Sequence, residues 1–159
     1  MTYDFKHLSG ADFEELVHDL LEVDWKTKLE IFAGGKDGGI DLRRQDETGL
    51  TIVQCKNYEG SGYAALKAKM RDSELPKIRK HKPDRYVLVS SVDLTVGQKD
   101  ELFTLLAPWV RAQTDIIGKK ELTARLEVHG EVVRRHHKLW LTSVAVMEQI
   151  LRGAERLQT

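Results

Sequence analysis

The chain has 159 residues, of which 41% are hydrophobic and 31% are charged, values ordinary for a globular protein with one domain over residues 1–159. No apolar run approaches the roughly 18 residues of a membrane span, and no signal peptide precedes Asp4, so we expect no membrane association. The formal net charge of zero means that any nucleic-acid binding must rest on local rather than overall positive charge.

The N-terminal region predicts an amphipathic helix. Ser9 and Asp12 form a start similar to a capping box, and apolar residues then recur at helical spacing, namely Phe13, Leu16, Val17, Leu20 and Leu21. A first strand is expected over residues 27–33, and a glycine-rich loop over residues 34–39. This loop lacks the Gly-Lys-Ser/Thr of a phosphate-binding loop, so we expect it to let the backbone approach DNA or a metal closely.

A β-hairpin is predicted next. Residues 40–46 and 50–58 both read as strands, separated by a short turn-type sequence. If Gln45 stands opposite Leu50, the same register places Asp41 opposite Gln54. Cross-strand partners share a face, and Lys56 projects from that face because it lies two residues beyond Gln54. One hairpin therefore presents a carboxylate, an amide oxygen and an ammonium group together.

The other face of this hairpin is apolar and suits a hydrophobic core; it carries Ile40, Leu42, Val53 and Cys55. Cys55 is the single cysteine, so it cannot form an internal disulfide, which fits a reducing, cytoplasmic location. We interpret it as a core residue rather than as a reactive thiol.

The remaining elements complete an α/β pattern. Residues 62–81 read as a helix interrupted near Pro76, residues 85–92 as a buried strand, and Thr95 with Gln98 caps a helix that runs through Leu106. A short strand is expected over residues 114–117, and helices over residues 121–128 and 142–157. Strands flanked by helices predict a three-layer α/β sandwich, whose central sheet is mixed because it contains both a hairpin and a helical crossover.

The polar face of the hairpin suits metal-assisted hydrolysis of a phosphodiester. Mg²⁺, with Mn²⁺ as a substitute, takes oxygen ligands, so Asp41 would be the principal ligand, and Gln54 and the backbone carbonyl of Cys55 could add oxygens. Lys56 could orient or deprotonate the attacking water and balance the charge on phosphorus. The alternative is a surface hairpin in which Asp41 only forms a salt bridge with Lys56.

Local positive charge follows the hairpin. Residues 67–85 are rich in lysine and arginine, so Lys67, Lys69 and Arg71, together with Lys36 of the glycine-rich loop, are candidate DNA-binding residues. The alternative is a solvated helix face. A second basic cluster at residues 134–138 contains two histidines, but no cysteine and no HxxxH pairing supports a zinc site there.

These motifs carry a resemblance. Asp41 followed by Gln54-Cys55-Lys56 resembles the active-site signature of the PD-(D/E)XK nuclease superfamily, in the variant where glutamine replaces the second acid. Residues 38–41 and 53–58 are together similar to Mrr-like, type IV restriction endonuclease domains. Residues 8–17 resemble the first helix of that family, whose glutamate helps to bind metal. The match implies Glu14 for this role, with Glu15 as the alternative, and the glutamine variant leaves the number of metals open.

The resemblance implies a restriction-endonuclease-like fold and cleavage of double-stranded DNA in restriction or antiphage defence. Residues 86–91, 115–118 and 138–141 resemble nuclease domains at the front of STAND-type antiphage ATPases, which implies an N-terminal effector domain of a longer protein. The alternatives are a catalytically silent DNA-binding or assembly module of the same fold, and a structure-specific junction nuclease.

We also expect a homo-oligomer when the enzyme is active, because one site of this kind cuts one strand. Four apolar residues of the C-terminal region could serve the core or bring two copies together: Trp140, Leu141, Val144 and Val146.

Overall fold

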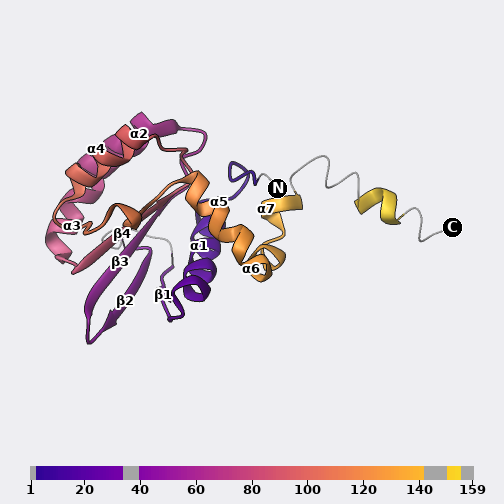
Figure 1. Cartoon of the computed structure of the whole chain (residues 1–159), viewed down its shortest axis with the longest axis horizontal. Coiled ribbons are helices and arrows are strands. Elements are labelled where there is room, and N and C mark those ends of the chain that lie inside the picture. The colour runs from indigo at the N-terminus through magenta and orange to yellow at the C-terminus, as the bar shows by residue number, and fades with distance from the viewer. Residues whose placement is uncertain (1–2, 34–39, 142–149, 155–159) are drawn as a thin grey trace.

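The computed structural model describes residues 3–33, 40–141 and 150–154, and Figure 1 shows them as one sheet between two layers of helices. The sheet follows chain order, with β1–β2–β3 antiparallel and β3–β4–β5 parallel, so the predicted mixed sheet is confirmed. Its strands are β1 (Glu30–Ile31), β2 (Leu42–Asp46), β3 (Gly49–Lys56), β4 (Arg85–Ser90) and β5 (Ile116–Ile117).

The helices cover both faces of this sheet. α1 and α5 lie on one side, and α2, α3 and α4 on the other (Figure 1), which is the predicted three-layer α/β sandwich. The helical segments are α1 (Gly10–Trp25), α2 (Gly62–Lys69), the π-helix η1 (Met70–Glu74), α3 (Leu75–His81), α4 (Val96–Leu106), the 3₁₀-helix η2 (Gln113–Asp115), α5 (Lys119–Val128), α6 (Gly130–Arg135) and α7 (Lys138–Leu141).

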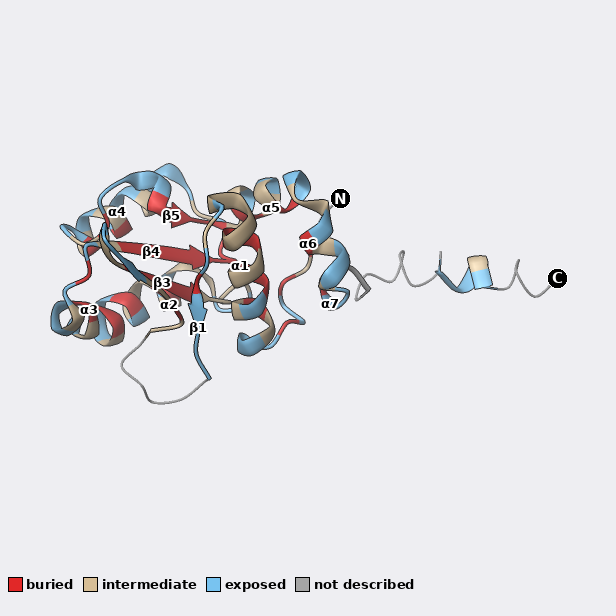
Figure 2. Cartoon of the chain, turned by 90° about the horizontal axis from the view of Figure 1, so that it is seen from below, coloured by how far each residue is buried: buried red, intermediate tan, exposed pale blue. Residues whose placement is uncertain are grey.

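Two hydrophobic clusters fill the space between the layers. One joins the apolar residues of α1 to the face of the sheet that carries Leu42, Val53 and Cys55. The other joins α2, α3 and α4 to the opposite face, where Ile52 and Leu88 lie. Strands β3 and β4 are buried along most of their length, whereas β1 is exposed at the edge (Figure 2).

The hairpin has the predicted register, with Gln45 opposite Leu50. Its pairing ends at Leu42 opposite Val53, and the chain bends at Asp41, so Asp41 does not stand in the ladder opposite Gln54 as the register alone predicts. The same bend turns Ile40 away from the core face. It packs against the second cluster, and the expectation that Ile40 shares a face with Leu42 is wrong.

Most other elements agree with their sequence signals. Ser9 and Asp12 form a capping box, and the five apolar residues predicted for α1 are all buried. The first strand is shorter than expected, with only Glu30–Ile31 paired, and α6 was not predicted. The helix expected over residues 142–157 lies largely outside the described residues, as do the glycine-rich loop and Lys36. No described helix is long and apolar enough to cross a membrane.

Candidate active site

The candidate site lies where the pairing of β2 with β3 stops. Asp41 sits one residue before β2, and its Oδ2 accepts a hydrogen bond of 2.8 Å from the backbone N–H of Cys55. The N–H and C=O of one strand residue point to the same side, so the carbonyl of Cys55 also faces this open edge. The carbonyl of Lys56 points the other way, toward β4, where it accepts a hydrogen bond from Ser90 Oγ at 2.8 Å.

Helix α1 brings a second carboxylate to Asp41. Glu14 lies beside the buried stripe of α1 and is half-buried, and it shares a hydrogen bond with Asp41. Burial, and then the adjacent charge of Asp41, raise the pKa of Glu14 from 4.5 to about 7. The next residue, Glu15, is exposed. The structure therefore places Glu14, and not Glu15, beside the hairpin.

The two carboxylates act as a coupled pair. Burial also raises the pKa of Asp41, although the hydrogen bond from Cys55 and the charge of Lys56 oppose this shift. The shared hydrogen bond raises the pKa of Glu14 and lowers that of Asp41, so Glu14 is the member of the pair that takes up a proton more readily. Two acids held this close in a partly buried place favour a cation or a proton between them.

Gln54 carries a neutral side-chain oxygen that is not hydrogen-bonded within the described fold. Its side chain is 3% exposed, and Oε1 is buried without a hydrogen-bond partner among the residues that the structure describes. Buried polar atoms are nearly always paired, so an unpaired oxygen on the residue before Cys55, whose N–H binds Asp41, needs an explanation. A hard divalent cation with oxygen ligands provides one, and the donor set of Glu14, Asp41 and Gln54 fits such an ion.

Lys56 follows Gln54 by two residues and meets an acid that the sequence analysis missed. Its Nζ lies 3.3 Å from Oε1 of Glu74, which is the last residue of η1. The exposed fractions of the two side chains are 12% and 3%, so the pair is buried. A signal was present in the sequence: at spacings of four residues, Glu74 falls on the helical stripe of Leu66, Met70 and Ile78, all of which are buried.

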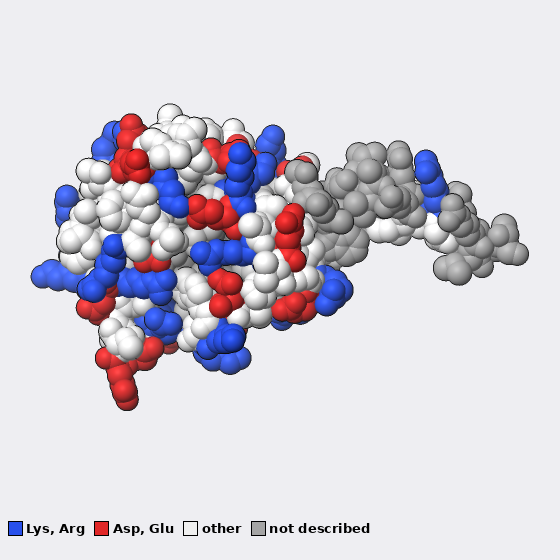
Figure 3. Space-filling model, viewed as in Figure 1, with Lys and Arg blue, Asp and Glu red and all other residues white. Residues whose placement is uncertain are grey.

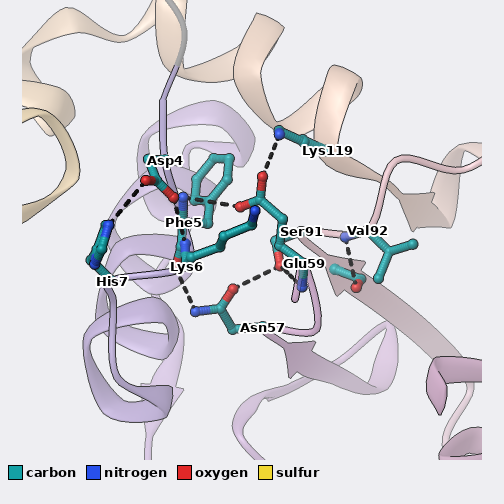
Figure 4. Close-up of polar contacts among 10 residues, drawn as sticks. Asp4, Phe5, Lys6, His7, Asn57, Glu59, Ser91, Val92 and Lys119 are labelled. Atoms are coloured by element: carbon teal, nitrogen blue, oxygen red, sulfur yellow. Dashed lines mark hydrogen bonds and ion pairs between the residues drawn. The ribbon is translucent and has the colours of Figure 1, made fainter. Parts of the chain in front are cut away.

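Residues just beyond Lys56 fasten the segment that leads into α1. Asn57 Nδ2 donates hydrogen bonds to the backbone carbonyls of Phe5 and Leu8, at 2.8 and 2.9 Å. Figure 4 shows Asn57 and Glu59 facing this segment, with the Phe5 N–H donating to Glu59 and Lys119 ion-paired with the same carboxylate. These hydrogen bonds join the end of β3 to the segment that leads into α1. They therefore fix the helix that carries Glu14 relative to the strand that carries Gln54 and Lys56.

Two of the basic residues proposed to meet DNA form ion pairs with acids other than those of the candidate site. Lys67 Nζ lies 3.3 Å from Glu101 and Arg71 Nε lies 2.8 Å from Asp72, whereas Lys69 is exposed. Basic and acidic side chains alternate over the face seen in Figure 3, and no field of a single sign covers it. The interaction of these residues with DNA stays a prediction.

The histidines of the C-terminal region serve to pack α6 and its flanks on α1. His129 Nε2 lies 3.1 Å from Asp24, and His136 Nε2 lies 2.7 Å from Asp19. His18, Asp19 and Glu22 also form a compact group of possible ligands, but both ring nitrogens of His18 already contact oxygens, at 2.9 Å from Asp19 and 2.9 Å from the Leu29 carbonyl.

Comparison with known proteins shows the family of the chain. Residues 5–97, more than half of the chain, match the Mrr_cat family, described as a restriction endonuclease. The chain is also 37% identical over 156 residues to the uncharacterized protein y4cD of Sinorhizobium fredii; the match covers 98% of this chain and 24% of that protein. The chain thus spans about a quarter of the relative's length. No solved structure matches it. The matched region contains Glu14, Asp41, Gln54 and Lys56, and the chain belongs to the Mrr-like restriction endonuclease family of PD-(D/E)XK nucleases.

Proposed function

We propose that the chain is a metal-dependent endonuclease that hydrolyses phosphodiester bonds of double-stranded DNA, with a role in restriction or antiphage defence. The observation that carries this proposal is the meeting of Glu14, Asp41, the unpaired oxygen of Gln54 and the cation of Lys56 at one end of β3. A purely structural hairpin would leave neither a buried amide oxygen unpaired nor two acids in hydrogen-bond contact.

Mg²⁺ or Mn²⁺ would be held by Glu14, Asp41, Gln54 and the backbone carbonyl of Cys55. When bound, such a cation polarises a phosphoryl oxygen and lowers the pKa of the attacking water. The chain's own contribution is to hold three side-chain oxygens at one edge, from α1, from the bend before β2 and from β3. The hydrogen bond from Cys55 N–H to Asp41 Oδ2 fixes the orientation of that carboxylate before any ligand arrives.

Lys56 supplies positive charge next to these oxygens. Its charge lowers the pKa of both Glu14 and Asp41, which places its ammonium group within electrostatic range of the pair. A cation there can stabilise the negative charge that develops on the phosphorus oxygens in the transition state. Because the side chain is largely buried, this interaction is less screened by water than a surface contact.

Two further parts of the proposal concern the assembled protein. Double-strand cleavage needs two sites in reach of the two backbones, so we propose that two copies act together. We also propose that the domain works as the N-terminal effector of a protein with a STAND-type nucleotide-binding module. Four residues were expected to serve the core or the contact between copies. The structure does not describe the side chains of Trp140 and Leu141, and Val144 and Val146 lie outside the described residues.

The experiment that tests the function compares substrates and metals. The purified chain is incubated with supercoiled plasmid or with a four-way junction, in Mg²⁺, in Mn²⁺ and in a chelator. We expect nicked and then linear plasmid with either metal and none with the chelator. Preference for the junction would make the chain a structure-specific nuclease, and DNA binding without cleavage would make it a silent module. A rate that is strictly first order in protein, from a proven monomer that yields linear product at once, would refute action in pairs.

A further inference from the structure

We propose that Glu74 is a positioning residue of the nuclease site, which holds the ammonium group of Lys56 in the place where the reaction needs it. This inference rests on the proposed function, because it assigns how one member of that site is oriented. Neither the signature residues nor the family match gives Glu74 a role.

The contact geometry supports the assignment. Glu74 Oε1 lies 3.3 Å from Lys56 Nζ and 3.7 Å from Lys77 Nζ, and only 3% of the Glu74 side chain is exposed. Lys77 is 44% exposed, so water competes for it, whereas Lys56 is enclosed with 12% of its side chain exposed. Lysine carries a flexible four-carbon stem, and such a side chain takes one position only where a fixed partner holds it.

The local fold explains why an acid at this position faces the sheet. Pro76 has no N–H, and its ring clashes with the carbonyl four residues earlier, so a regular α-helix cannot run unchanged through this point. The chain instead widens into the π-helix η1, and Leu75 N–H bonds to the carbonyl of Met70, five residues back. Such π turns in α-helices occur frequently at functional sites. The turn leaves Glu74 on the stripe with Met70 and Ile78, which is buried against the sheet.

The charge of Glu74 also affects the pKa values of neighbouring groups. After burial, it contributes to the raised pKa of Asp41 and to that of the Tyr86 hydroxyl. An apolar residue at position 74 would also pack in the buried stripe, but it would have no electrostatic effect on Asp41. Burying a glutamate there costs stability unless its partner compensates, and an ion pair of this kind is weak evidence for a stabilising role alone. The position of the pair next to the carboxylates is what favours a functional one.

The test is a double-mutant cycle on single-turnover plasmid cleavage with residues 1–159. Glu74→Gln keeps the side-chain volume and removes the charge, and we expect it to lower the cleavage rate about 10- to 100-fold, as when a group that orients a reacting residue is lost. In a Lys56→Ala background the same change should alter the residual rate by less than about twofold, because the residue through which Glu74 acts is gone. The matched control is Glu121→Gln on α5, which removes an ion pair with Lys99 of α4 and should leave the rate unchanged.

Two further measurements keep the result open to refutation. Glu74→Asp retains the charge on a shorter stem, and it should fold even where Glu74→Gln does not and show the same loss that depends on Lys56. Nitrogen NMR of lysine ammonium groups gives a readout independent of activity. The ammonium hydrogens of Lys56 should exchange slowly with water in the wild type, and this slow exchange should be lost in Glu74→Gln. Equal losses from Glu74→Gln with and without Lys56, or an unchanged Lys56 signal, would overturn the proposal. A wild type that cuts no DNA but shows the NMR effect would instead reject the proposed function.

Discussion

The two ends of the central strands differ in how far their polar groups are paired. At the end where β4 begins, Arg85 donates two hydrogen bonds to Asp115, at 3.1 and 2.8 Å, and its guanidinium lies over the ring of Trp25. Asp84 accepts from the Leu50 N–H through its side chain and donates to the Leu50 carbonyl through its own N–H. At the end where β3 stops, Gln54 Oε1 has no partner among the described residues, and the carboxyl groups of Glu14 and Asp41 share a hydrogen bond.

This difference separates stability from function within one sheet. Satisfied ion pairs and backbone contacts at the β4 entrance add to the free energy of unfolding. Crowded carboxylates and an unpaired amide oxygen at the β3 exit lower it, unless a cation binds there. Proteins tolerate such costs mainly at sites of activity, since optimising stability there removes function. Loss of charge at the β3 exit should therefore raise the melting temperature and impair cleavage, whereas loss of charge at the β4 entrance should lower the melting temperature and leave cleavage unchanged.

The largest effect is expected from Asp41→Asn. Asparagine keeps an oxygen that can accept the hydrogen bond from Cys55 N–H, but it removes the charge that we assign to the metal site. We expect the cleavage rate to fall about 10³-fold or more, as when a central electrostatic group is lost, while the melting temperature at pH 8 rises. The rise follows because Glu14 loses its like-charged neighbour. Plasmid cleavage and circular dichroism on the same preparation measure both; a variant that is less stable, or that still cleaves, contradicts the comparison.

At the opposite end, Asp115→Asn should lower the stability and leave cleavage unchanged. Asp115 is 6% exposed, and its loss of charge leaves Arg85 without its bidentate partner. Breaking such a pair costs about 2–3 kcal/mol in the free energy of unfolding, less than for a fully buried pair because Arg85 is partly exposed. Urea denaturation gives the stability, and the cleavage rate below the transition should equal that of the wild type. A folded variant with impaired cleavage would show that the two ends are not independent.

The turn at the same end gives a smaller effect. Gly49 has φ of +116°, and a Cβ at this position would lie 2.2 Å from Asp84 Oδ2, the atom that accepts the Leu50 N–H. We expect Gly49→Ala to lower the free energy of unfolding by about 1–2 kcal/mol through backbone strain and loss of this contact. Gly97→Ala is the control, because a Cβ there meets nothing within 4 Å in α4 and should stabilise the helix. Equal melting temperatures for the two variants would remove the role given to this turn.

Much of the fold could be predicted because its signals are local. The capping residues of α1 and α4, the hairpin register and the buried strand β4 are each set by neighbours in the chain. The bend at Asp41 could not be predicted, since it depends on where the partner strand stops pairing.

The features of the site also divide into those set by local sequence and those set by tertiary contacts. The register brought Asp41 near Gln54 and Lys56, but the carboxylate bonds the Cys55 backbone instead of standing across from Gln54. The distinction between Glu14 and Glu15 required the packing of α1, and Glu74 required the tertiary contact of η1 with β3. Long-range contacts of this kind leave only faint signs in one sequence, such as an acid on a buried stripe.

The smallest effect concerns the proton on Glu14. Its pKa is raised from 4.5 to about 7, so below about pH 7 a metal must displace a proton to use this carboxylate. Affinity for Mn²⁺ should therefore rise between pH 6 and pH 8, by less than about tenfold for each pH unit, and protons should be released on binding. Titration calorimetry in two buffers of different ionisation enthalpy measures both quantities.

Glu14→Gln should weaken Mn²⁺ binding and flatten this pH dependence, because the glutamine carries no proton to displace. Some dependence remains, since the pKa of Asp41 is also raised. Glu15→Gln is the matched control on the next, exposed position of α1, and it should bind Mn²⁺ with nearly the wild-type affinity and pH profile. If Glu15→Gln weakened binding more than Glu14→Gln, the role of metal ligand would pass to Glu15. The raised pKa of Glu14 would then reflect only its burial and its proximity to Asp41.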